Sequence, residues 1–171
     1  MPLVYLDACA IIDAREKQTS EAQALTHLLV EGSDERPFVT SDLTLIEVLV
    51  QPIRGLFSQI STEEQSEDRK NHDWYLANLV PDGPLFQTIP VDRDILHQAA
   101  ILRARVKSMK TPDAIHVATA CRSACTHFVT GDDKLIRSVQ QDETWSTWPK
   151  RFEFVSLTVE SLDNLRRLLA S

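Results

Sequence analysis

Four carboxylates lie beside strongly apolar segments, where soluble proteins seldom place a charge. They are Asp7, Glu47, Asp113 and Asp132. A carboxylate pushed toward a core is costly unless a cation neutralises it. No basic partner is obvious beside each of the four in the sequence, so together they suggest a site for a divalent metal ion.

Two of the acids follow segments that are typical of strands. Asp7 comes directly after the apolar run 3–6, and Asp132 comes shortly after the run 127–130. Ligands of open α/β sheets gather beyond the carboxyl ends of the strands. We therefore expect Asp7 and Asp132 to meet at that edge of the sheet.

Glu47 interrupts the segment 43–50, which is otherwise almost entirely apolar. Ser41 or Asp42 is a suitable start for a helix here, and Pro52 is expected to end it. Glu47 would then lie in mid-helix with little polar surface to share. The alternative is an exposed edge of a mostly buried helix.

Asp113 falls in the first turn of an expected helix, with Thr111 as the N-cap and Pro112 as the first helical residue. A capping aspartate favoured by the helix dipole is the simpler interpretation. Because Thr111 would already supply the cap, that interpretation is weakened. His116, one turn later, could orient a water or a substrate phosphate, although a hydrogen-bonded histidine at a helix edge is the more ordinary expectation.

The whole chain has 171 residues and a net charge of −7. Strand-like segments alternate with helix-like ones, which predicts an α/β fold of three layers (α/β/α) with a mostly parallel central sheet. The strand-like segments are 3–6, 37–40, 86–91, 127–130 and 152–157. We expect a single domain over residues 1–171, with a polar insertion near 54–73 that becomes a helix from Thr62.

Composition narrows the functional classes. The negative charge argues against a protein that coats nucleic acid by bulk electrostatics. No apolar run is long enough for a membrane span, and the first strand leaves no room for a secretion signal, so we expect a cytoplasmic protein without membrane contact. Cys121 and Cys125, with His116 and His127 nearby, could form a zinc site, but small buried hydrophobes are the more ordinary interpretation.

Four segments in order resemble the PIN-domain family, in particular its toxin-type (VapC-like) ribonucleases. These segments are Tyr-Leu-Asp-Ala-Cys-Ala-Ile-Ile at 5–12, Thr-Ser-Asp-Leu-Thr-Leu-Ile-Glu-Val at 40–48, Thr-Pro-Asp-Ala-Ile-His-Val-Ala-Thr-Ala at 111–120, and Phe-Val-Thr-Gly-Asp-Asp-Lys-Leu at 128–135. The resemblance places the family's acids on Asp7, Glu47, Asp113 and Asp132, and its small hydroxyl residue on Thr130. Residues 54–71 and the segment after Asp132 lengthen the chain beyond a minimal toxin.

The resemblance implies an endoribonuclease that depends on Mg²⁺ or Mn²⁺, with a cognate antitoxin as partner and a homodimer as the suggested assembly. Hard oxygen ligands suit these ions, so Asp7, Asp113 and Asp132 are the candidate metal ligands. Glu47 is the candidate for holding a water or acting as general base. Basic residues near the acids could contact RNA phosphates or could be an ordinary solvated face. These residues are Arg103, Arg105, Lys107, Lys110, Lys134 and Arg137.

Other functions remain open from the sequence. A phosphatase of the haloacid-dehalogenase type would need a second aspartate two residues after Asp7, where Cys9 stands. A structure-specific DNA nuclease shares the site chemistry but usually carries more acids. A catalytically inactive PIN-fold scaffold that binds RNA or protein would have no reason to keep four costly charges.

Overall fold

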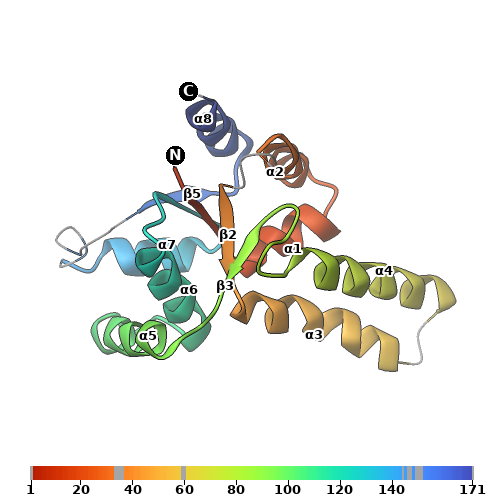
Figure 1. Cartoon of the computed structure of the whole chain (residues 1–171), viewed down its shortest axis with the longest axis horizontal. Helices are drawn as coiled ribbons and strands as arrows, with labels where there is room; N and C mark the ends of the chain where they lie inside the picture. The colour runs from red at the N-terminus through yellow and green to blue at the C-terminus, as the bar shows by residue number, and fades with distance from the viewer. Residues whose placement is uncertain are drawn as a thin grey trace.

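The computed structural model describes residues 2–32, 37–58, 61–143, 145, 148 and 152–170. In this part of the chain, five parallel strands form one sheet in the order β3-β2-β1-β4-β5 (Figure 1). The strands are β1 (Val4–Leu6), β2 (Phe38–Ser41), β3 (Gln87–Ile89), β4 (His127–Thr130) and β5 (Glu153–Ser156). Each predicted strand is present, with bounds that differ from the prediction by two residues at most.

Helices cover both faces of the sheet, which confirms the predicted three-layer α/β/α architecture. They are α1 (Ala8–Glu16), α2 (Ser20–Glu31), α3 (Leu43–Phe57), α4 (Thr62–Asn78), α5 (Arg93–Arg105), α6 (Thr111–Arg122), α7 (Asp133–Gln140) and α8 (Val159–Leu169). Among the described residues, no helix has the length and apolar character that crossing a membrane would require.

The central strand β1 shows why the strand segments are continuous apolar runs in the sequence. All three of its residues are buried, because it pairs with β2 on one side and β4 on the other and has helices on both faces. Tyr5 faces a core shared with α5, α6 and α7, whereas Val4 and Leu6 face a core shared with α1, α2, α4 and α8. Because the side chains of β1 alternate between the two faces of the sheet, this one strand contributes to both cores.

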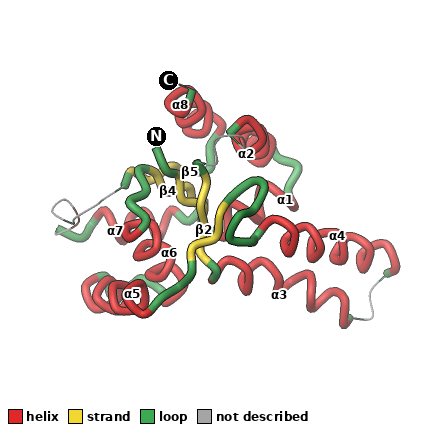
Figure 2. The backbone as a smooth tube through the Cα atoms, viewed as in Figure 1, coloured by secondary structure: helices red, strands yellow, loops and turns green. Residues whose placement is uncertain are grey.

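The polar segment that follows Glu47 differs from the prediction. Pro52 does not end α3, which continues through it to Phe57, so the first residues of the predicted polar insertion form the last turn of this helix. The predicted helix from Thr62 is confirmed as α4, whose N-cap Ser61 and Glu64 form a reciprocal capping box. Helices α3 and α4 lie side by side and extend away from the sheet (Figure 2).

The tryptophan-containing segment before β5 is only partly within the described residues, because 144, 146–147 and 149–151 lie outside them. Trp145 and Trp148 are described, and their rings stack with centroids 6.3 Å apart. Trp145 also makes an edge contact with Phe152 at 5.3 Å. These rings close the core on the side of α5 to α7.

Candidate active site

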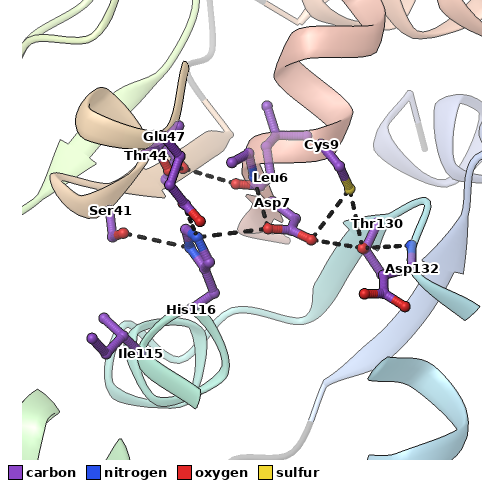
Figure 3. A network of polar contacts seen from close by, with 12 residues as sticks. Leu6, Asp7, Cys9, Ser41, Thr44, Glu47, Ile115, His116, Thr130 and Asp132 are labelled. Carbon is purple, nitrogen blue, oxygen red and sulfur yellow. Dashed lines mark hydrogen bonds and ion pairs between the residues drawn. The ribbon is translucent and has the colours of Figure 1, made fainter. Parts of the chain in front are cut away.

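The carboxyl ends of three neighbouring strands bring the site together. Asp7 directly follows β1, Ser41 ends β2 and Thr130 ends β4. These strands are adjacent and parallel, so their ends open at one edge of the sheet. Helices α3 and α6 bring Glu47 and His116 to the same edge (Figure 3).

Asp7 is buried, with 9% of its surface exposed, and both of its oxygens are engaged. As the N-cap of α1, it accepts a hydrogen bond on Oδ1 from the backbone N–H of Ala8 at 2.8 Å. On Oδ2 it accepts bonds from the hydroxyl of Thr130 at 2.7 Å and the thiol of Cys9 at 3.3 Å. Neutral donors therefore hold this carboxylate in a single orientation at the strand end.

Glu47 points from α3 toward a histidine and is partly buried. Its Oε2 lies 2.6 Å from Nε2 of His116, and the Glu47 side chain is 28% exposed. Some of the apolar neighbours that made Glu47 conspicuous are themselves exposed, among them Ile46 at 63%. The Glu47 side chain therefore lies neither on a fully solvated helix edge nor inside the hydrophobic core.

His116 is almost fully buried and lies between two carboxylates, which differs from the expected position at a helix edge. Its Nε2 is 2.6 Å from Glu47 Oε2 and 3.6 Å from Asp7 Oδ1. Its Nδ1 is 2.7 Å from the hydroxyl of Tyr5 and 3.5 Å from that of Ser41. Burial lowers the pKa of His116, but the hydrogen bond to Glu47 and the charges of Asp7, Glu47 and Asp113 outweigh burial and raise it overall.

Asp113 lies in the first turn of α6, as predicted, but its capping role differs from the prediction. The N-cap is Lys110 and Thr111 is the first helical residue. The Asp113 Oδ2 accepts the backbone N–H of Lys110 at 3.3 Å, so Asp113 itself caps the helix. Burial raises the pKa of this half-buried carboxyl, and the charges of Asp7 and Asp132 raise it further against the opposing effect of Lys110.

Asp132 is the N-cap of α7 and is connected to Asp7 through the hydroxyl of Thr130. Its Oδ1 accepts the backbone N–H groups of Lys134 at 2.9 Å and Leu135 at 3.1 Å. Its own backbone N–H donates to Thr130 Oγ1 at 3.0 Å, and that hydroxyl in turn donates to Asp7. Thr130 therefore sets the spacing between the two strand-end acids.

The donor chemistry of Asp7, Asp113 and Asp132 fits a hard divalent cation. The charges of Asp7 and Asp132 act on Asp113, which places the three carboxylates in one local field. In the described part of the chain, however, no three His, Cys, Asp or Glu side chains are close enough to form a ready metal cluster. Mg²⁺ commonly uses one or two carboxylates and keeps several waters, so this wider spacing suits it.

The zinc interpretation has no support within the described residues. Cys121 and Cys125 are free and buried, and burial raises the pKa of each thiol to about 12. A thiol with that pKa does not readily become the thiolate that binds zinc. Both residues belong to the apolar core beside α5 and α6, as the simpler interpretation predicted.

Sequence reasoning missed the polar side chains that surround His116 and the end of β2. Tyr5 and Ser41 contact His116, and Thr40 donates to the Leu6 carbonyl at 2.8 Å and bonds Thr44 at 2.6 Å. The spacing of His116 three residues after Asp113 was a usable signal for a shared helix face. The role of Tyr5 had no such signal, because it depends on which strand face meets α6.

Solved structures with a similar fold include components of toxin–antitoxin complexes. The FitAB complex bound to a DNA fragment matches with a TM-score of 0.60 and 15% identity over 91% of this chain and 95% of that chain. VapBC from Salmonella typhimurium, bound to DNA, matches with a TM-score of 0.60 and 11% identity over 92% and 100%. VapBC2 from Rickettsia felis, bound to a promoter fragment, matches with a TM-score of 0.58 and 12% identity over 88% and 96%.

These likenesses support the fold, and a search of the curated proteins gave no match. The family comparison covers most of the sequence: the model described as the PIN domain matches residues 4–141, a range that contains all four predicted acids. The chain belongs to the PIN domain family.

Proposed function

We propose that the protein is an endoribonuclease that depends on Mg²⁺ or Mn²⁺. PIN domains are generally nucleases. The observation that carries the proposal is that Asp7 and Asp132 follow the ends of the adjacent strands β1 and β4, and that their charges add to burial in raising the pKa of Asp113. A cation would relieve that repulsion.

Each acid then has a distinct task. Asp7, Asp113 and Asp132 would hold the metal ion, which when bound supplies Lewis-acid polarisation of the phosphate. Glu47 would hold the attacking water and take its proton, because its Oε1 accepts no hydrogen bond within the described residues. Thr130 fixes Asp7 and Asp132 relative to each other through its single hydroxyl.

RNA would need positive charge near this acidic edge. Lys110 precedes α6 and acts electrostatically on Asp113, so it is the best placed candidate for contacting a phosphate. Arg105 is less free for that task, because its guanidinium lies 5.1 Å from the centre of the Trp148 ring. Arg103 is also engaged, through a bond from Nε to the Met109 carbonyl at 3.3 Å.

The test is cleavage of single-stranded RNA with Mg²⁺ or Mn²⁺, with and without a chelator. Wild type is expected to cleave RNA only with metal, and Asp7→Asn and Asp113→Asn are expected to lose at least about 100-fold in kcat. Asp94→Asn is the matched control, since Asp94 also lies in the first turn of a helix but is exposed and paired with Arg122. Cleavage that survives chelation or both substitutions would reject the proposal.

The alternatives give different results in the same assay. A structure-specific DNA nuclease would cleave DNA in preference to single-stranded RNA under the same metal conditions. An inactive RNA- or protein-binding scaffold would cleave neither substrate, and the two Asp→Asn variants would bind RNA like wild type.

We also propose that the protein is the toxin of a toxin–antitoxin pair. The similar structures from Rickettsia and Salmonella carry the VapBC name, and FitAB is also a complex. Helix α3 carries an exposed apolar stripe that a partner helix or a second copy would cover. Its residues are Ile46, Val50, Ile53 and Phe57.

The partner proposal is tested by co-expression with the protein encoded next to this chain. A stable complex that silences cleavage would support the antitoxin role. A homodimer is tested separately, by measuring the mass of the purified chain in solution.

A further inference from the structure

Three lysines lie beside the candidate site without a carboxylate partner. Lys107 and Lys110 are in the loop between α5 and α6, and Lys134 is in the first turn of α7. All three are exposed, and in the described part of the chain none of them forms an ion pair. The other described lysines, Lys17 and Lys70, are paired with carboxylates at 2.6 and 3.2 Å. The charges of Lys107, Lys110 and Lys134 are therefore available to a ligand.

Backbone hydrogen bonds fix two of these lysines next to acids of the candidate site. The Lys110 N–H donates to Asp113 Oδ2 at 3.3 Å, and the Lys134 N–H donates to Asp132 Oδ1 at 2.9 Å. Each ammonium group is a compact charge on a flexible stem. Because the backbone of each lysine is bonded to an acid, each ammonium group can reach only the surface that surrounds that acid.

One side-chain hydrogen bond joins the two segments that carry the lysines. Ser108 Oγ donates to Ser138 Oγ at 2.9 Å, although the two residues are 30 positions apart. Ser108 lies between Lys107 and Lys110 in the loop. Lys134 lies one turn before Ser138 on the same face of α7. The three lysines therefore flank a single contact between the α5–α6 loop and α7.

The α5–α6 loop is anchored on both sides of Ser108. Val106 and Met109 are buried in the core that α5, α6 and α7 share, and the Met109 carbonyl accepts a bond from Arg103 Nε at 3.3 Å. These three helices lie on the same side of the sheet (Figure 1). A loop anchored in this way presents its charges in one arrangement, so binding an anion requires little further ordering of the backbone.

We propose that Lys107, Lys110 and Lys134 form a phosphate track, which contacts the phosphodiester backbone of a single-stranded nucleic acid beside the bond that the acids would cleave. The track belongs to the proposed nuclease site, so the proposal rests on that function. Lysines bind phosphates as point charges and do not distinguish bases. Because the net charge of −7 repels a polyanion from the molecule as a whole, binding depends on this local group of lysines.

The test measures binding without cleavage, in EDTA and without divalent metal. The probes are a fluorescent single-stranded RNA and the single-stranded DNA of the same sequence, each titrated at several KCl concentrations. Each single Lys→Gln substitution in the track is expected to reduce the slope of log K against log[KCl] by about 0.7, and the triple variant by about 2. The reduction should be the same for RNA and DNA and for unrelated sequences, because only phosphates are contacted.

Lys17→Gln and Lys70→Gln are the matched controls, because they remove the same charge from exposed lysines that are paired elsewhere. Both are expected to keep the slope of wild type. A triple variant with the wild-type slope would overturn the proposal, as would equal losses in the control variants. Wild type that binds neither probe saturably at low salt would overturn it too, and so would a loss of slope with RNA alone.

Hydrogen exchange gives the place of binding independently of the substitutions. The RNA probe is expected to slow amide exchange at 106–110 and 134–138 and to leave α4 unchanged. Protection confined to α3 and α4 would overturn the proposal. Because all three lysines are exposed, the triple variant is expected to have the melting temperature of wild type.

The binding assay separates failure of the phosphate track from failure of the proposed function. If wild type binds RNA with the expected loss of slope in the triple variant but cleaves no RNA with metal, the nuclease proposal fails and the track stands as a nucleic-acid-binding surface. If wild type cleaves RNA and the triple variant keeps the wild-type slope, the track is rejected and the nuclease proposal stands.

Discussion

At the scale of single residues, one hydroxyl holds two acids. Thr130 donates to Asp7 Oδ2 at 2.7 Å and accepts the backbone N–H of Asp132 at 3.0 Å. Thr130 is fully buried, so its hydroxyl has no water to replace either partner. The orientation of the Asp7 carboxylate in the proposed site therefore depends on the uncharged side chain of Thr130.

Replacing this hydroxyl should weaken the fold. Thr130→Val keeps the shape but leaves Asp7 with one fewer donor in a buried site, so we expect a loss of about 1–3 kcal/mol in the free energy of unfolding. Urea denaturation measures it. Thr126→Val is the matched control, because its hydroxyl is exposed and, within the described residues, bonds only the Leu3 carbonyl and His127. Equal losses in the two variants would contradict the role of Thr130.

Asp113 should make the metal-free protein less stable as pH rises. Its pKa in the folded state is raised by burial and by Asp7 and Asp132, so ionising it costs more in the folded chain than in the unfolded one. The contribution of protonated Asp113 to the free energy of unfolding is complete below the ordinary carboxyl pKa. It is lost as pH rises through the raised pKa of the folded state.

Asp113→Asn should therefore have a higher melting temperature than wild type at pH 7 without metal. The difference should shrink as pH falls below the ordinary carboxyl pKa, where the wild-type side chain is also neutral. Thermal melts between pH 3.5 and 8 with a chelator measure this, and Asp94→Asn serves as the control. A difference in melting temperature between Asp113→Asn and wild type that grows toward low pH would contradict this prediction.

At the scale of elements, the site depends on helix ends as much as on strand ends. Asp7 is the N-cap of α1, Asp132 is the N-cap of α7 and Asp113 lies in the first turn of α6, so three of the four acids lie where a helix dipole favours negative charge. Glu47 is the exception, in the middle of α3. Its position is held instead by the ring of His116.

Helix α4 should depend on its capping box. Ser61→Ala removes the side-chain acceptor for the Glu64 N–H, which should cost about 0.5–2 kcal/mol and speed amide exchange in the first turns of α4. Hydrogen exchange resolved along 62–78 measures it. Glu63→Gln, in the same turn but outside the capping box, should leave exchange nearly unchanged.

Local patterns predicted some elements well and others poorly. The apolar runs before Asp7 and Asp132 correctly predicted where β1 and β4 end, because a strand buried on two faces is apolar throughout. Pro52 misled the prediction, since a helix that projects from the body can continue through a proline at some cost. His116 could be placed on the face of Asp113, but its contact with Glu47 depends on how α3 and α6 pack, which no local pattern encodes.

At the scale of the whole molecule, the acids come from segments that are far apart in the chain. The sheet order β3-β2-β1-β4-β5 puts the first strand in the centre, so both neighbours of β1 arrive through long crossovers. The metal-free fold must therefore bring together charges that repel each other. Folding and the proposed metal site are linked for this reason.

Metal should stabilise the whole chain. A ligand present at about 100 times its Kd adds about 2.7 kcal/mol, which for a chain of this size raises the melting temperature by about 5–10 °C. We expect such a rise with millimolar Mg²⁺ or Mn²⁺, measured by scanning calorimetry. Asp7→Asn and Asp132→Asn should lose most of it, and no rise in wild type would count against the site.

The parallel topology also has a consequence for the order of synthesis. Asp7 and Thr130 are separated by 123 positions, so Thr130 leaves the ribosome about 6–25 s after Asp7. During that interval a nascent chain carries the first acid but neither the hydroxyl that holds it nor Asp132. Under the proposed function, a partly made chain that lacks Thr130 and Asp132 would not cleave the message from which it is translated.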